Sequence, residues 1–296
     1  MKFEIRDPYA RSLGVEISEK TDTGLTTVTP MDDTVCNIYA IGHGGFVYSV
    51  GHITAALAAQ VCLGRQTVVV DVSSQYLCAL RQPTAVTEAV LVRAGRELVV
   101  YRTYIRDARG ALCCVQTVTL KTVQYPEAPV TTVQPTIFPA APDTPPEPVT
   151  GLAYPRMSPH FATRCHIYNL GPNGDGMHYG VELYPELCNL YGALHGGVVY
   201  TLCDVAAGGH AAFLLEKRPM TVSSSIHFLR SARNGPIYAQ SRLLRDGKQL
   251  LFCAVDLTDS ADEPVATAEF VLQSVQFDPV FPPDRGSQRG PFGQVG

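Results

Sequence analysis

"CNIYAIGHGGFVYSVGHITAA" at residues 36–56 and "CNLYGALHGGVVYTLCDVAAG" at residues 188–208 align without a gap, 152 residues apart. The same register continues further along the chain. Asp107 matches Asp259, and "LKTVQ" from Leu120 matches "LQSVQ" from Leu272. Spacing that holds over such a distance indicates an internal repeat rather than a chance similarity. We therefore expect two copies of one domain in these 296 residues.

The composition between the copies sets the expected boundaries. Ten prolines lie between positions 126 and 159, which excludes helix or central strand there. Residues 278–296 have the Gly, Pro and polar composition of a loose tail. The sequence thus predicts a first domain over residues 1–125, a proline-rich linker over 126–160, a second domain over 161–277 and a flexible tail.

Each copy shows one helical pattern followed by strand patterns. The apolar runs 44–63 and 196–215 are long enough for helices of about five turns, and Gly64 is a plausible stop for the first. β-branched, alternating segments follow at 66–77, 84–92, 97–105 and 111–120, with counterparts in the second copy. The Asp-Gly pair in "RDGK" at 245–248 predicts a hairpin. We expect an α+β fold, with a helix on an antiparallel sheet, made twice.

Composition and charge exclude several classes of function. The net charge of -4, without a basic run, gives no general attraction for nucleic acid or an anionic membrane. No run of about 18 apolar residues stands out, and the first residues lack a signal-peptide pattern, so we expect a cytoplasmic protein. Nine cysteines without a C-x-x-C pair predict free buried thiols and no metal site.

The second copy carries the spaced pattern N-x-x-G-x-x-H-G-G, followed seven residues later by an acid; its residues are Asn189, Gly192, His195, Gly196, Gly197 and Asp204. This pattern, with "SSSIHFLRSARNG" and "RDGKQLLF", resembles the PaaI-type (phenylacetyl-CoA thioesterase-like) hotdog acyl-CoA thioesterases. The resemblance spans both copies. It implies two tandem hotdog domains, each a long central helix wrapped by an antiparallel sheet, that form an intrachain pseudo-dimer. It also implies a coenzyme A thioester of a small or aromatic acyl group as substrate, no other cofactor, and a homo-oligomer of such chains.

The residues themselves suggest how a thioester would be activated. Unpaired N–H groups at a helix start stabilise a developing oxyanion, and glycine lets the acyl group approach them. A rise of 1.5 Å per residue places Asp204 about 12 Å beyond Gly196, too far to serve the same carbonyl. The resemblance implies antiparallel central helices, so one site combines Asn37, His43 and Gly44 with Asp204. There Asp204 acts as general base or as nucleophile, and Asn37 positions water or the acid.

The matching second site departs from the pattern, because residue 52 is histidine where the other copy has Asp204. His52 is expected to face Asn189, His195 and Gly196. A neutral histidine can act as a base near pH 7. We nevertheless expect this site to be altered or silent.

Further residues complete the expected sites. The resemblance places a hydroxyl near the acid, with Thr221 favoured over Ser223 and Ser224. Expected substrate contacts are Gly45, Gly197, Ser223, Arg81 and Arg233. The two arginines, together with Arg230 and Lys248, are the candidates for contacts with coenzyme A phosphates. Solvated strand ends are the alternative explanation for the arginines. Backbone capping is the alternative for His43 and His195, and a turn role for Asn37 and Asn189.

Two other functions remain open on the sequence alone. A hotdog hydratase or dehydratase of acyl thioesters would divide acid and base work between a histidine and an aspartate, as His52 and Asp204 offer. A non-catalytic acyl-CoA-binding module would explain the degenerate copy.

Overall fold

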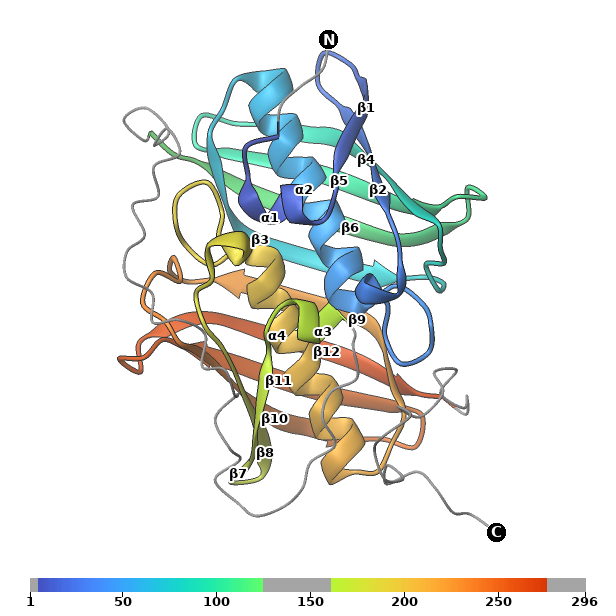
Figure 1. The fold of residues 1–296 in the computed structure, drawn as a ribbon, viewed down its shortest axis with the longest axis vertical. Coiled ribbons are helices and arrows are strands. Elements are labelled where there is room, and N and C mark those ends of the chain that lie inside the picture. The colour runs from blue at the N-terminus through green and yellow to red at the C-terminus, as the bar shows by residue number, and fades with distance from the viewer. Residues whose placement is uncertain (1–4, 125–160, 276–296) are drawn as a thin grey trace.

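The computed structural model describes residues 5–124 and 161–275 (Figure 1). The predicted linker and tail lie outside these residues, so the expected domain boundaries stay a prediction. Within the described part, all strands join one antiparallel sheet of twelve in the order β1-β2-β4-β5-β6-β3-β9-β12-β11-β10-β8-β7. One long helix lies on each half of it (Figure 1).

The first half follows the predicted pattern closely. Helix α2 spans Gly44–Leu63, with His43 as its N-cap and Gly64 as a left-handed C-cap at φ 64°. The apolar face of α2 packs on alternating strand residues, which is why the period-two segments became strands. The strands of this half are β1 (Glu16–Lys20), β2 (Leu25–Pro30), β3 (Thr67–Tyr76), β4 (Thr84–Ala94), β5 (Leu98–Asp107) and β6 (Leu112–Thr122).

The second half repeats this order with one difference. The predicted continuous helix 196–215 is wrong in detail, because α4 ends at Gly209 and a single π-helical turn, His210–Leu214, follows. Two successive glycines weaken the α-helix at this point, and the wider turn brings His210 Nδ1 to 3.0 Å from Ser241 Oγ. The strands are β7 (Tyr168–Asn173), β8 (Gly176–Val181), β9 (Pro219–Phe228), β10 (Ile237–Asp246), β11 (Leu250–Thr258) and β12 (Pro264–Ser274). "RDGK" forms the predicted β10–β11 hairpin.

Equivalent residues of the two copies meet at the junction between the halves. Strand β3 pairs with β9 so that Ser73 lies opposite Ser225. The rings of Tyr48 on α2 and Tyr200 on α4 stack with centroids 3.8 Å apart and planes 3° apart. Both pairs are 152 residues apart in the sequence. The core is therefore continuous across the junction.

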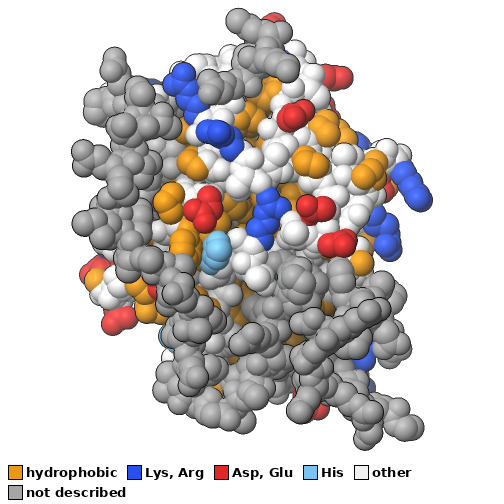
Figure 2. Space-filling model, viewed as in Figure 1, with side chains coloured by type: hydrophobic (Ala, Val, Ile, Leu, Met, Phe, Trp, Pro, Cys, Tyr) orange, Lys and Arg blue, Asp and Glu red, His pale blue; other side chains and the backbone are white. Residues whose placement is uncertain are grey.

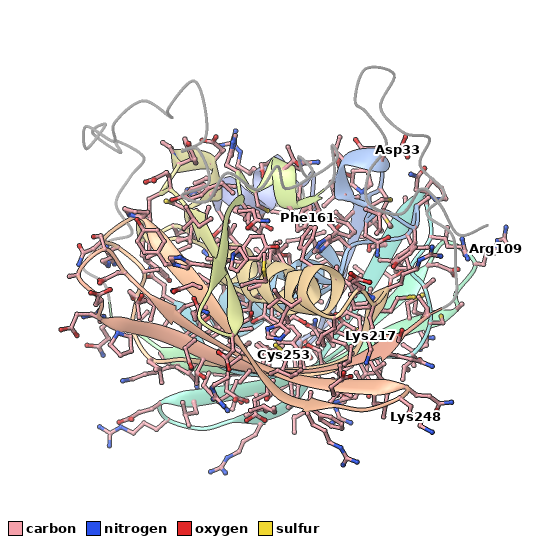
Figure 3. The ribbon with its side chains drawn as sticks, turned by 90° about the horizontal axis from the view of Figure 1, so that it is seen from below. Asp33, Arg109, Phe161, Lys217, Lys248 and Cys253 are labelled. Carbon is pink, nitrogen blue, oxygen red and sulfur yellow. The ribbon has the colours of Figure 1, made fainter. Side chains whose placement is uncertain are left out.

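Helices α2 and α4 run antiparallel through their first turns. A Cβ atom at Gly45 would overlap the side chain of Thr201, and one at Gly197 would overlap Ser49. These two glycines therefore allow close helix packing. Figure 3 shows α4 lying on the concave face of the curved sheet.

Short segments before each sheet cross to the other half. Helix α1 (Pro8–Ser12) packs on the turn η2 (Pro185–Leu187), and Tyr9 lies 4.6 Å, centroid to centroid, from the His195 ring. Helix α3 (Phe161–Arg164) packs on η1 (Asp33–Val35) in the same way. Figure 3 shows Phe161 on the side of the helix layer away from the sheet.

Two described helices, Gly44–Leu63 and Gly196–Leu214, are long and apolar enough to cross a membrane. Most of each helix is buried inside the fold: 72% and 78%, respectively, of its most apolar stretch of 18 residues. Their apolar character is thus accounted for by the core. On the face shown in Figure 2, acidic and basic side chains are interspersed over the described part.

The close helix contact makes a testable prediction. Gly45→Ala should lower the free energy of unfolding by about 1–3 kcal/mol, because the new methyl group overlaps Thr201. Gly208→Ala is the matched control in α4, since a Cβ there meets no atom within 4 Å, and it should stabilise by about 0.5–1 kcal/mol. Denaturant unfolding of both variants measures this. Equal effects at the two positions would contradict the packing argument.

Candidate active site

Two cavities lie on opposite flanks of the α2–α4 pair. One has a volume of about 720 Å³ and is lined by Asn37, His43 and Gly44 of the first half together with Asp204 and Thr221 of the second. The other, about 310 Å³, is lined by His52 of the first half and by Asn189, His195 and Gly196 of the second. Each cavity thus joins one helix start to the other helix, which is the combination that the resemblance implies.

Asp204 lies directly against the start of α2. A Cβ atom at Gly44 would be 2.7 Å from Asp204 Oδ2, so only glycine leaves room for the carboxylate. Thr221 Oγ1 on β9 donates a hydrogen bond to Oδ1 at 2.7 Å. Asp204 is 8% exposed. One oxygen is therefore held by a hydroxyl, and the other faces the first turn of α2.

The N–H of Gly44 is the first of α2 and has no acceptor among the described residues. The next N–H, of Gly45, donates to His43 Nδ1 at 3.0 Å. An Nδ1 that accepts leaves the ring proton of neutral His43 on Nε2. Burial lowers the pKa of His43, although nearby Asp204 opposes this, and the Nδ1–Oδ2 distance is 3.4 Å. His43 therefore caps α2 through the Gly45 N–H, and Gly44, whose N–H is left unpaired among the described residues, lines the cavity.

The two asparagines organise the loops before the helices. Asn37 Oδ1 accepts from the Tyr39 N–H at 2.9 Å, and Asn189 Oδ1 accepts from the Tyr191 N–H at 2.9 Å. Both side chains also line their cavities. The geometry thus includes the turn role that the sequence left open, and it places Asn37 in the same cavity as Asp204.

A chain of hydroxyl groups beside Asp204 was missed from the sequence. Tyr76 on β3 lines the larger cavity and donates to the Gly44 carbonyl oxygen at 3.0 Å. Its hydroxyl also lies 2.8 Å from that of Tyr200, which in turn lies 2.7 Å from Ser224 Oγ. The sequence did hold a signal for Tyr76, because the aligned position in the other copy is Phe228, which lacks the hydroxyl.

The smaller cavity has lost each of these polar partners. His52 replaces the acid, Val69 replaces Thr221, and Phe228 replaces Tyr76. The hydroxyl of Tyr48, the counterpart of Tyr200, is buried without a partner among the described residues. The prediction that this site is altered is consistent with these replacements.

Asp7, which sequence reasoning missed, supplies a carboxylate to the smaller cavity. It is the N-cap of α1, accepts from the Ala10 N–H at 2.9 Å and lies 3.9 Å from His195 Nε2 through Oδ2. Burial raises its pKa to about 6, while the N–H groups of Ala10 and Leu190 favour the charged form. Asp7 lies outside the aligned repeat, so the repeat alone gave no signal for it.

Several predicted contacts are not in the cavities. Gly45 and Gly197 face the opposing helix rather than substrate. Ser223 points to the outer face, because a bulge in β9 beside Val222 breaks the alternation and its neighbour Ser224 faces α4. Exposed Arg81 and Arg233 line neither cavity.

Of the cations expected to contact phosphates, Arg230 lines a cavity, together with cations that were not predicted. Lys217 and Arg218 line the larger cavity, and Figure 3 shows Lys217 near the α4 end of the helix layer. The smaller cavity is lined by Arg65, Lys121 and Arg230. No group of three or more potential metal-ligating side chains occurs within residues 5–124 and 161–275.

His52 and Asp204 line different cavities. They therefore cannot divide acid and base work on one substrate. The hydratase alternative loses the residue pair that favoured it.

Comparisons with known proteins find similarity to thioesterases and esterases. Residues 191–266 match the family model described as Thioesterase superfamily. A Haemophilus influenzae protein provisionally named an esterase is 27% identical over 113 residues, which cover 38% of this chain and 82% of that protein. A Mycobacterium tuberculosis protein with the same provisional name is 29% identical over 115 residues, 37% of this chain and 81% of its own length.

Solved structures extend the likeness over most of the chain. A structure from Alicyclobacillus acidocaldarius, titled as a conserved protein of unknown function with hot dog fold, has a TM-score of 0.62 at 14% identity, covering 88% of this chain and 96% of that one. An acyl-CoA thioesterase II from Mycobacterium marinum has a TM-score of 0.58 at 14% identity, covering 93% and 100%. The fold is therefore the hotdog fold. At such identities these structures carry no further conclusion.

His195 should make stability depend on acidity. Burial lowers the pKa of His195 to about 3, below the ordinary value of 6.5. As pH falls through 6.5, His195 becomes protonated in the unfolded chain but stays neutral in the folded chain, so the folded state loses stability. His195→Asn keeps a capping side chain and removes this titration. Between pH 6.5 and pH 5 the wild type should lose about 2 kcal/mol of unfolding free energy relative to the variant. Asp7 is present in both proteins, so its titration does not distinguish them. Denaturant unfolding at each pH measures the free energy of unfolding, and parallel pH dependences in the wild type and the variant would contradict the role of His195.

Proposed function

We propose that this chain is an acyl-CoA thioesterase of the PaaI type, in which two tandem hotdog domains form an intrachain pseudo-dimer. The observation that supports the proposal best is that Asp204 packs against the first turn of α2. A Cβ atom added at Gly44 would lie 2.7 Å from Asp204 Oδ2. An oriented carboxylate and a free helix-start N–H in one cavity are the two groups that thioester hydrolysis needs.

In the proposed reaction the thioester carbonyl oxygen accepts a hydrogen bond from the Gly44 N–H. Asp204 Oδ2 takes a proton from a water molecule, whose oxygen adds to the carbonyl carbon. Negative charge then develops on the carbonyl oxygen, where the helix-start amide stabilises it. Collapse of the intermediate breaks the C–S bond, and the coenzyme A thiolate takes the proton from Asp204. The products are a carboxylate and coenzyme A.

The roles of the neighbours follow from their contacts. Thr221 holds Oδ1 of Asp204 and leaves Oδ2 beside the first turn of α2, where it can act as the general base. Tyr76 holds the Gly44 carbonyl and so the first turn of α2. The apolar lining, including Val47, Val205 and Met220, suits a small or aromatic acyl group. Arg218 and Lys217, which also pairs with Asp246, line this cavity and add positive charge for phosphates.

Asp204→Asn tests the proposal. With a panel of acetyl-, hexanoyl- and phenylacetyl-CoA, we expect kcat to fall by about 10²–10⁴-fold, because the base is lost while the shape is kept. Release of free thiol is the measurement. Asp256→Asn is the control, since this exposed carboxylate on β11 lines neither cavity. Full turnover in Asp204→Asn combined with its loss in His52→Ala would assign hydrolysis to the other cavity.

Thr221→Val tests the orientation of the base. Removing one hydrogen bond to a buried carboxylate should lower kcat by roughly tenfold, with KM little changed, because the bond orients Asp204 without touching the substrate. The counterpart in the other half is already valine, at position 69. An unchanged kcat would show that Thr221 has only a structural role.

A further inference from the structure

We propose that the smaller cavity, around His52 and Gly196, binds a coenzyme A thioester without hydrolysing it. The inference rests on the proposed function for its ligand class. It goes beyond that function in assigning a second, non-catalytic site to the chain.

His52 is the first observation that points to a ligand. It is 5% exposed, lines the cavity, and its Nδ1 is buried without a hydrogen-bond partner among the described residues. An unsatisfied buried polar atom is costly and rare in folded proteins. A ligand that brings a carbonyl oxygen into the cavity would give the imidazole a partner.

The helix start beside His52 adds a second donor. The N–H of Gly197 is capped by His195 Nδ1 at 2.9 Å, whereas the N–H of Gly196 has no acceptor among the described residues. A Cβ atom at Gly196 would lie 2.9 Å from His52 Cε1. The imidazole edge and the Gly196 amide are thus adjacent, and together they can donate to one carbonyl oxygen.

The same cavity has His52, and no carboxylate, in the position that Asp204 takes in the larger one. Burial and the neighbouring His195 hold the pKa of His52 well below 6.5, which makes its imidazole a weak acceptor of protons from water. No carboxylate pairs with His52 among the described residues. Asp7 also lines the cavity, where burial raises its pKa to about 6, but its Oδ1 accepts the Ala10 N–H and its Oδ2 lies 3.9 Å from His195 Nε2. With Val69 and Phe228 in place of Thr221 and Tyr76, the two hydroxyl contacts that hold Asp204 and the Gly44 carbonyl in the larger cavity have no counterpart here.

The remaining lining fits the rest of the ligand. Apolar side chains such as Leu57 and Val199 surround the acyl position, and the volume of about 310 Å³ is less than half that of the larger cavity. Lys121 lines the cavity and has no acidic partner among the described residues. Arg230 on the same lining is paired with Asp259 and Glu263, and Arg65 donates to the Gly95 carbonyl oxygen. Lys121 is therefore the cation that can pair with a coenzyme A phosphate.

Binding stoichiometry tests the proposal. The probes are S-phenacyl-CoA and S-(2-oxohexyl)-CoA, in which a methylene between sulfur and carbonyl prevents hydrolysis. Calorimetric titration of the full chain should show two sites. Ala56→Trp should remove one, and Gly208→Trp, its counterpart 152 residues on in the larger cavity, should remove the other. A single site in the wild type, or two sites in Ala56→Trp, would overturn the proposal.

His52→Leu covers the case in which Ala56→Trp does not fold. It removes the imidazole donor while keeping a buried apolar side chain, and it should weaken one of the two sites by roughly tenfold, the loss of about one hydrogen bond. Equal affinities in the wild type and the variant would contradict the assignment of His52.

Turnover separates this proposal from the proposed function. Asp204→Asn should bind two probe molecules yet release no thiol above background from acyl-CoA. Residual release that His52→Leu or Asp7→Asn abolishes would show that the smaller cavity is catalytic and would overturn the inference. A wild type that releases no thiol from any acyl-CoA would refute the proposed function, while the stoichiometry would still decide whether two ligands bind.

Discussion

Everything at the two cavities depends on the close antiparallel approach of α2 and α4. Glycines at the first two helical positions of each helix remove the side chains that would hold the pair apart. The first glycine admits a side chain of the opposing helix, Asp204 or His52, and the second admits Thr201 or Ser49. The stacked rings of Tyr48 and Tyr200 lie midway between these contacts. One packing arrangement thus fixes helix-start amides and opposing side chains together.

Much of this arrangement could be predicted because it is periodic. The repeat defined the two copies, the apolar runs gave the start of both helices and the end of α2, and alternation gave the central strands. The distance along α4 showed that Asp204 must act beside a helix start of the other copy. The resemblance supplied the antiparallel pairing of the two helices, from which the contact between Gly44 and Asp204 followed.

What escaped prediction depends on local irregularity or on contacts outside the repeat. A single extra residue at Val222 reverses the facing of Ser223, and no composition signal marks such a bulge. Asp7 reaches the second cavity on a five-residue helix, α1, that precedes the repeated pattern. The arginines Arg81 and Arg233 were chosen by charge, yet the position of a loop side chain depends on the tertiary fold.

The crossing of α1 and α3 has a consequence for how such a chain can be divided. Phe161 at the head of the second half lies 5.8 Å, ring to ring, from His43 of the first, and Tyr9 of the first half covers His195 of the second. Each copy therefore supplies the aromatic ring that covers the helix cap of the other copy, and also part of the lining of the adjacent pocket. Either half taken alone would therefore lack the aromatic ring that covers its helix cap and the opposing wall of its pocket.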